Sequence, residues 1–106
     1  MKILLDECLP LDFRHCFPHH DAHTAEWAGF KGKKNGELLR AAEVAGYDVL
    51  LTVGQGIPHQ NLGVRRLSII LIRSRTNQME DLVPLADAIT LALEAIQPGQ
   101  TVVIPS

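Results

Sequence analysis

The segment YDVLLTV, residues 47–53, is a short, mostly apolar run that ends at Gly54. Strands with one face in water alternate apolar and polar residues, whereas a continuous apolar run is typical of a strand buried on both faces of a parallel sheet. Similar runs occur as KILL, RLSIILIR and TVVIP, at residues 2–5, 66–73 and 101–105. A weaker candidate is HDAHTA at 20–25, so the sequence predicts five strands.

Helices are predicted over residues 10–17, 36–45 and 80–96, and in the last two apolar side chains recur at helical spacing. Pro10 opens the first of them and Pro18 ends it, because proline fits the first helical turn and cannot continue a helix. Asn35 is a suitable N-cap for the second helix and Gly46 a suitable C-cap.

The alternation of strands and helices predicts an α/β fold, a single three-layer domain over residues 1–106 with a mostly parallel five-stranded sheet. Right-handed crossovers favour the strand order 2-1-3-4-5. The chain then reverses direction between the first and third strands, and ligands bind at such a switch point. Asp6 and Gly54, which follow these two strands, should flank that crevice.

Composition excludes several classes of protein. The 106 residues carry a net charge of −2, so a nucleic acid would have to be bound by a local basic patch. No apolar run approaches the roughly 18 residues of a membrane span, and MKILLDE does not resemble a signal peptide. We therefore expect a cytoplasmic protein without membrane contact, in which Cys8 and Cys16 are reduced thiols.

Three acids are candidates for a metal site. Asp6 and Glu7 follow the first strand, and Glu37 lies in the first turn of the second helix, which should begin near the same rim. Neighbouring carboxylates favour a hard divalent cation such as Mg²⁺ or Mn²⁺, which can assist phosphodiester hydrolysis. The alternatives are a solvated strand end for Asp6 and Glu7, and a helix-dipole contact for Glu37.

Together, MKILLDECLP, GKKNGELL and LLTVGQGIPHQNL, in this order and spacing, resemble the small bacterial PIN-like domains related to the toxin ribonucleases of toxin–antitoxin pairs. The resemblance covers nearly the whole chain. It implies an Mg²⁺- or Mn²⁺-dependent endoribonuclease with Asp6 and Glu37 as catalytic and metal-binding acids. We further expect Glu7 to assist metal binding through an outer-shell water. The resemblance also implies RNA as substrate, an antitoxin-like partner protein and a possible homodimer.

One position departs from the family pattern. Relatives carry an acid where this chain has Gly54, and the loop that follows is one residue shorter. Glycine offers no side chain to a metal, so we expect impaired activity. The alternative is a non-catalytic module of the same fold that binds RNA or a protein.

Substrate contacts are predicted for basic and amide side chains on the same rim, namely Lys33, Lys34, Asn35, Gln55, Arg73 and Arg75. Trp27 and Phe30 lie beside the lysines, and we expect both to pack into the core rather than to stack on a base. The segment HCFPHHDAH, residues 15–23, has no zinc-finger spacing and is predicted to be a surface turn. Cys8 has no activating neighbour in the sequence, which argues against a catalytic thiol.

Overall fold

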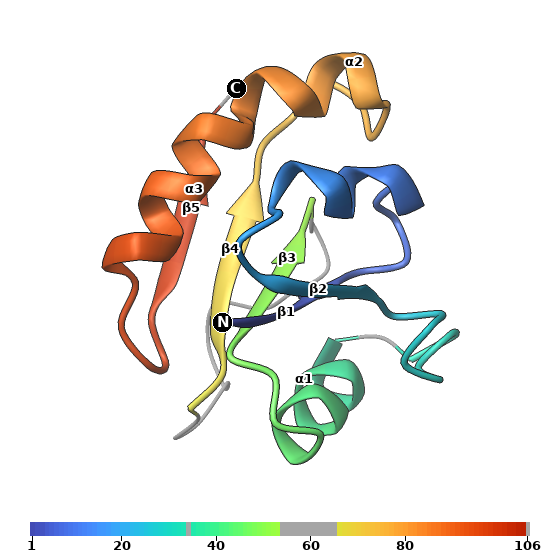
Figure 1. Ribbon diagram of the computed structural model, residues 1–106. Coiled ribbons are helices and arrows are strands. Elements are labelled where there is room, and N and C mark those ends of the chain that lie inside the picture. The colour runs from blue at the N-terminus through green and yellow to red at the C-terminus, as the bar shows by residue number, and fades with distance from the viewer. Residues whose placement is uncertain (34, 54–65, 106) are drawn as a thin grey trace.

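The computed structural model describes residues 1–33, 35–53 and 66–105. Five parallel strands form one sheet in the order β2-β1-β3-β4-β5, which confirms the predicted fold class and strand order (Figure 1). The strands are β1 (Lys2–Leu5), β2 (Asp21–Thr24), β3 (Val49–Thr52), β4 (Ser68–Ile72) and β5 (Thr101–Ile104). The weakest sequence signal, HDAHTA, therefore does form a strand, at the edge of the sheet.

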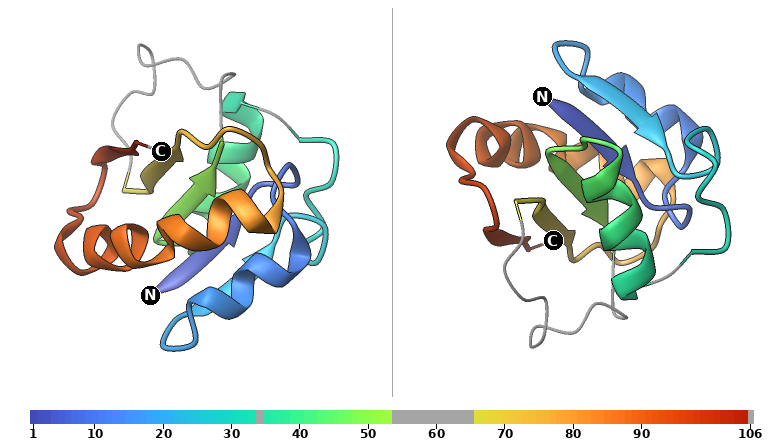
Figure 2. Two further views of the ribbon diagram at one scale, coloured as in Figure 1. Left: turned by 90° about the horizontal axis from the view of Figure 1, so that it is seen from above. Right: turned by 90° about the horizontal axis from the view of Figure 1, so that it is seen from below.

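Helices cover both faces of the sheet, as the views in Figure 2 show. They are the 3-10 helices η1 (Leu11–Cys16) and η2 (Val83–Leu85) and the α-helices α1 (Asn35–Val44), α2 (Met79–Leu82) and α3 (Ala86–Ala95). Of the helices in the described ranges, α1 covers one face of the sheet and the others lie on the opposite face. None of the helices in the described ranges has the length and apolar character that crossing a membrane requires.

The core has two halves because side chains alternate across each strand. Ile3, Leu5, Val49 and Leu51 belong to the cluster packed by η1, α2 and α3, whereas Leu4, Leu50 and Ile69 belong to the cluster under α1. Asp6 follows Leu4 by two positions and Thr52 follows Leu50 by two. The same alternation therefore directs both polar side chains to the α1 side of the sheet.

The ends of α1 follow the sequence signals closely. The helix begins at Asn35, one residue before the predicted range. It ends at Val44 and is followed by Gly46, whose φ of +86° is in the left-handed region that favours glycine. The Gly46 and Tyr47 amides donate to the carbonyls of Glu43 and Ala42 at 3.1 and 3.0 Å, which is the Schellman pattern and confirms the predicted C-cap.

The structure corrects the predictions for two other elements. The helix predicted over 80–96 is divided into α2, η2 and α3, because Pro84 lacks an amide proton and its ring conflicts with regular α-helical bonding. The prediction that the fifth strand is buried on both faces is wrong. Strand β5 lies at the edge of the sheet, and Val103 is 41% exposed.

Candidate functional site

Asp6 lies at the carboxyl end of β1, where its amide donates to the Leu51 carbonyl at 2.9 Å and extends the pairing with β3. Its half-buried carboxylate is held by two donors. The Thr52 hydroxyl donates to Oδ2 at 2.8 Å, and the Glu7 amide donates to Oδ1 at 2.7 Å. The carboxylate thus has a fixed orientation, and each oxygen keeps acceptor capacity for a further ligand.

Thr52 is a site residue that the sequence analysis missed. Its side chain is fully buried, and Leu5 pairs with Leu51, so Asp6 and Thr52 occupy neighbouring positions at the ends of adjacent strands. The available signal was the matching alternation of the two strands. Gly54 was predicted to lie beside Asp6; the adjacency of β1 and β3 agrees with this, but Gly54 itself is outside the described residues.

Glu7 points toward the loop that precedes α1. Its side chain is exposed, and its Oε2 accepts a hydrogen bond from the Gly32 amide at 3.2 Å. Gly32 has a φ of +87°, a conformation that glycine adopts without strain. Glu7 therefore links the end of β1 to the loop that carries Lys31 and Lys33.

Glu37 is exposed in the first turn of α1. One of its carboxylate oxygens lies 3.9 Å from the ammonium nitrogen of Lys33, a solvent-exposed pair of the kind that contributes little to stability. Within the described parts of the chain, no three His, Cys, Asp or Glu side chains gather closely enough to hold a metal ion. The shared Asp6–Glu37 cation site remains a prediction.

The predicted substrate contacts are only partly described. Arg73 and Arg75 follow β4 and are exposed, and Lys33 is half-buried. Lys34 and Gln55 fall outside the described residues, as does the side chain of Asn35.

Asn77 is a second residue that the sequence analysis missed. It follows Arg73 and Arg75 in the loop between β4 and α2, and its Nδ2 donates to the Cys8 carbonyl at 2.9 Å. This bond joins the arginine-bearing loop to the loop that follows Asp6. Because the two residues are 69 positions apart, no local pattern could have indicated the contact.

Cys8 lies beside the Asp6–Thr52 pair, with its sulfur 3.9 Å from the Thr52 hydroxyl oxygen. Burial raises the pKa of the Cys8 thiol, and the nearby Asp6 carboxylate raises this pKa further. Burial also raises the pKa of Cys16. Both cysteines are free, as expected, and Cys8 stays a protonated thiol at neutral pH, which makes it a poor nucleophile.

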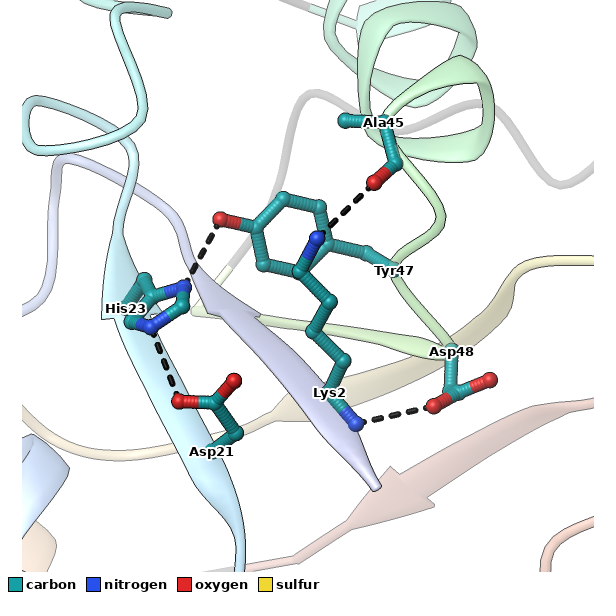
Figure 3. Close-up of polar contacts among 6 residues, drawn as sticks. All are labelled: Lys2, Asp21, His23, Ala45, Tyr47 and Asp48. Carbon is teal, nitrogen blue, oxygen red and sulfur yellow. Dashed lines mark hydrogen bonds and ion pairs between the residues drawn. The ribbon is translucent and has the colours of Figure 1, made fainter.

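Two residues of the histidine-rich segment, Asp21 and His23, belong to a polar network (Figure 3). His23 Nε2 donates to Asp21 Oδ1 at 2.9 Å, and His23 Nδ1 lies 3.0 Å from the Tyr47 hydroxyl. Because a carboxylate only accepts, Nε2 carries a proton in the contact with Asp21, and Nδ1 makes the second contact, with the phenol oxygen. The ammonium group of Lys2 lies 4.5 Å above the Tyr47 ring and donates to the Ala45 carbonyl at 2.9 Å.

The two aromatic residues beside the lysines differ in burial. Phe30 is half-buried against the α1 core cluster, as expected. The expectation for Trp27 is wrong: it is 70% exposed and stacks on His23, with ring centroids 4.1 Å apart. The Trp27 amide donates to the Thr24 hydroxyl oxygen at 3.1 Å. This bond belongs to a turn after β2, from which the indole side chain extends into solvent.

Comparison with known proteins finds no relative of this chain. No protein-family model, no curated protein and no solved structure matches the chain.

Proposed function

We propose that this chain is a PIN-like domain whose carboxyl-end rim is organised for Mg²⁺- or Mn²⁺-dependent cleavage of RNA, with Asp6 as the central metal ligand. The observation that carries the proposal is the orientation of the Asp6 carboxylate by Thr52 and the Glu7 amide at the end of β1. A half-buried carboxylate at the switch point of a parallel sheet lies where such folds bind ligands.

The donors at this rim fit a hard cation. They are carboxylate oxygens, and Mg²⁺ commonly binds through one or two carboxylates while keeping several waters. Asp6 would be one ligand and Glu37 the second, with Glu7 acting through an outer-shell water. When bound there, the cation would supply Lewis-acid activation of water and stabilisation of charge on the phosphoryl group.

The chain's own residues would bind and orient the RNA. Arg73, Arg75 and Lys33 would neutralise backbone phosphates, with Lys34, Asn35 and Gln55 as further contacts. Asn77 would hold the arginine loop near the Asp6 rim through its bond to the Cys8 carbonyl. The two free thiols suit the reducing conditions of a cytoplasmic protein.

We expect the ribonuclease activity to be weak, because Gly54 occupies a position where the family that this chain resembles has an acid. A missing carboxylate lowers the charge that favours cation binding, and a misplaced nucleophile is costly even in an intact fold. A non-catalytic RNA- or protein-binding module is the second candidate. It is favoured by Gly54 and by the lack of a three-ligand group among the described residues.

The test compares Mn²⁺ affinity by calorimetry and cleavage of labelled single-stranded RNA for the unchanged chain, Gly54→Asp, and Gly54→Asp combined with Asp6→Ala. Gly54→Asp should raise metal affinity and cleavage by about tenfold or more, because even outer partners of a metal contribute about 10–100-fold. Asp6→Ala should abolish the gain.

Gly54→Asp combined with Asp12→Asn is the matched control, because Asp12 is an exposed acid on η1. It should retain the gain in full. If Gly54→Asp folds but binds Mn²⁺ no better, the carboxylate-site model is wrong. RNA binding without cleavage by every variant would favour the non-catalytic module.

A further inference from the structure

A groove runs along the free edge of the sheet, between η1 and the outer side of β2, with a volume of about 670 Å³. Strand β2 is the terminal strand on this side, and η1 lies next to it (Figures 1 and 2). The groove is lined by Leu11, Arg14, Phe17, Ala22, Thr24 and Trp27, among others. It involves none of the proposed metal ligands.

The backbone of β2 presents hydrogen-bonding groups to this groove. The amides of Asp21 and Ala25 donate to the Met1 and Leu5 carbonyls of the β1 side at 2.9 and 2.8 Å. Because bonding groups in a parallel strand alternate between its two edges, those of Ala22 and Thr24 point away from β1. The Thr24 carbonyl accepts from the Ala28 amide at 3.0 Å. Both groups of Ala22 and the Thr24 amide remain directed into the groove.

Two exposed apolar side chains line this groove. Leu11 is 56% exposed on η1, and Trp27 is 70% exposed after β2. The Trp27 ring is held in place by its stacking on His23. Exposed large apolar side chains that flank open strand groups are typical of a surface that accepts another chain.

Arg14 gives the groove a cationic group that favours a carboxylate beside it. Arg14 is half-buried in its wall, and no carboxylate of the described residues lies within ion-pair distance of its guanidinium. His15 and His20 also line the groove. Asp21 is its one acidic lining residue among those described, and its carboxylate is bonded to His23. A carboxylate from a partner would complete the pairing of Arg14.

We propose that this edge binds an extended peptide segment of a partner protein, with alternating apolar and acidic side chains, as a sixth strand beside β2. Main-chain bonds to Ala22 and Thr24 supply the pairing, and Leu11 and Trp27 contact the apolar side chains. Arg14 binds a peptide carboxylate. The proposal is independent of nuclease activity, and the open donor and acceptor of Ala22 together favour a peptide strand over the phosphate groups of a nucleic acid, which offer only acceptors.

The test is an NMR titration of the ¹⁵N-labelled protein with a blocked heptapeptide of alternating valine and glutamate. The Ala22 and Thr24 amide signals should shift, whereas the His23 amide, which faces β1, should shift little. The Arg14→Glu variant should weaken binding by about tenfold, equivalent to one charge-assisted contact. The same loss is expected for a peptide with lysine in place of glutamate.

Two variants make the test specific. Arg40→Glu, an exposed charge reversal on α1, should leave peptide binding unchanged. Ala22→Pro removes only an amide that faces the open edge, where proline is tolerated, and should abolish binding in a chain that still folds.

Three outcomes would overturn the proposal: no shift of Ala22 and Thr24 at millimolar peptide, equal binding by Arg14→Glu, or shifts of these amides by a single-stranded oligoribonucleotide but not by peptide. Concentration-dependent shifts of the same amides without peptide would instead identify a second copy of the chain as the occupant and also contradict it.

Discussion

Asp6 owes its orientation to a residue from a different strand. The Thr52 hydroxyl is fully buried, and its proton is directed to Asp6 Oδ2 at 2.8 Å. A buried hydroxyl needs a partner, and a carboxylate accepts a strong, charge-assisted bond. The pair therefore contributes to stability while it restricts the positions that the carboxylate can adopt.

We predict that Thr52→Val destabilises the protein by about 1.5 kcal/mol, the low end of the range for hydrogen bonds to charged groups, because water can reach the half-buried Asp6. Urea unfolding measures the change. Thr90→Val is the control, since the Thr90 hydroxyl donates to the Ala86 carbonyl of its own helix at 2.9 Å rather than to a carboxylate. An equal loss in both variants would mean that the contact with Asp6 contributes nothing specific.

Helix α1 offers a paired test at the scale of an element. Gly46 has a φ of +86° after the last turn, whereas Gly36 lies in the first turn without a positive φ, and an added methyl group would meet nothing within 4 Å at either position. An added side chain therefore has room at both positions, and the two glycines differ in backbone conformation.

Gly46→Ala should lower the free energy of unfolding by about 1 kcal/mol, because a side chain is strained in the left-handed region. Gly36→Ala should raise it by about 0.5 kcal/mol, because alanine is the better helix former. Thermal unfolding followed by circular dichroism measures both changes. Effects of the same sign would show that the two glycines are not distinguished by backbone conformation.

At the scale of the whole molecule, the burial of Cys8 and Tyr47 makes the free energy of unfolding depend on pH in the alkaline range. Burial raises the pKa of Cys8 above its ordinary value of 9.0, and burial followed by the charge of Asp21 raises the pKa of Tyr47 above 10.0. Above those ordinary values the unfolded chain loses protons that the folded chain retains. Stability from these groups is therefore complete below about pH 9 and falls as the pH rises through the folded-state pKa values.

We predict that the urea midpoint, measured under reducing conditions, falls between pH 8.5 and 10.5, and that it falls less steeply in the Cys8→Ala, Tyr47→Phe double variant. The comparison concerns the slope with pH, because the double variant also loses packing and the hydrogen bond to His23. An unchanged slope would assign the alkaline loss of stability to other groups.

Much of the candidate site follows from local patterns. Asp6 is at a strand end because an apolar run stops there, and Glu37 is in a first helical turn because Asn35 and the apolar spacing of 36–45 define the start of the helix. The orientations of these acids could not be predicted in the same way. Thr52, Gly32 and Asn77 reach their partners from other elements, and each contact depends on how strands and loops meet in space.

The sequence by itself determined the strands, their parallel order and the capped helix α1, because alternation, apolar runs and glycine or proline signals act over a few neighbouring residues. The tertiary structure alone decided that Trp27 faces solvent, that Val103 of β5 is exposed, that His23 joins Asp21 to Tyr47, and that Arg14 lines a groove beside β2. Those features depend on contacts between distant segments. Which side chains become buried or paired is settled only when the whole sheet and its helices pack together.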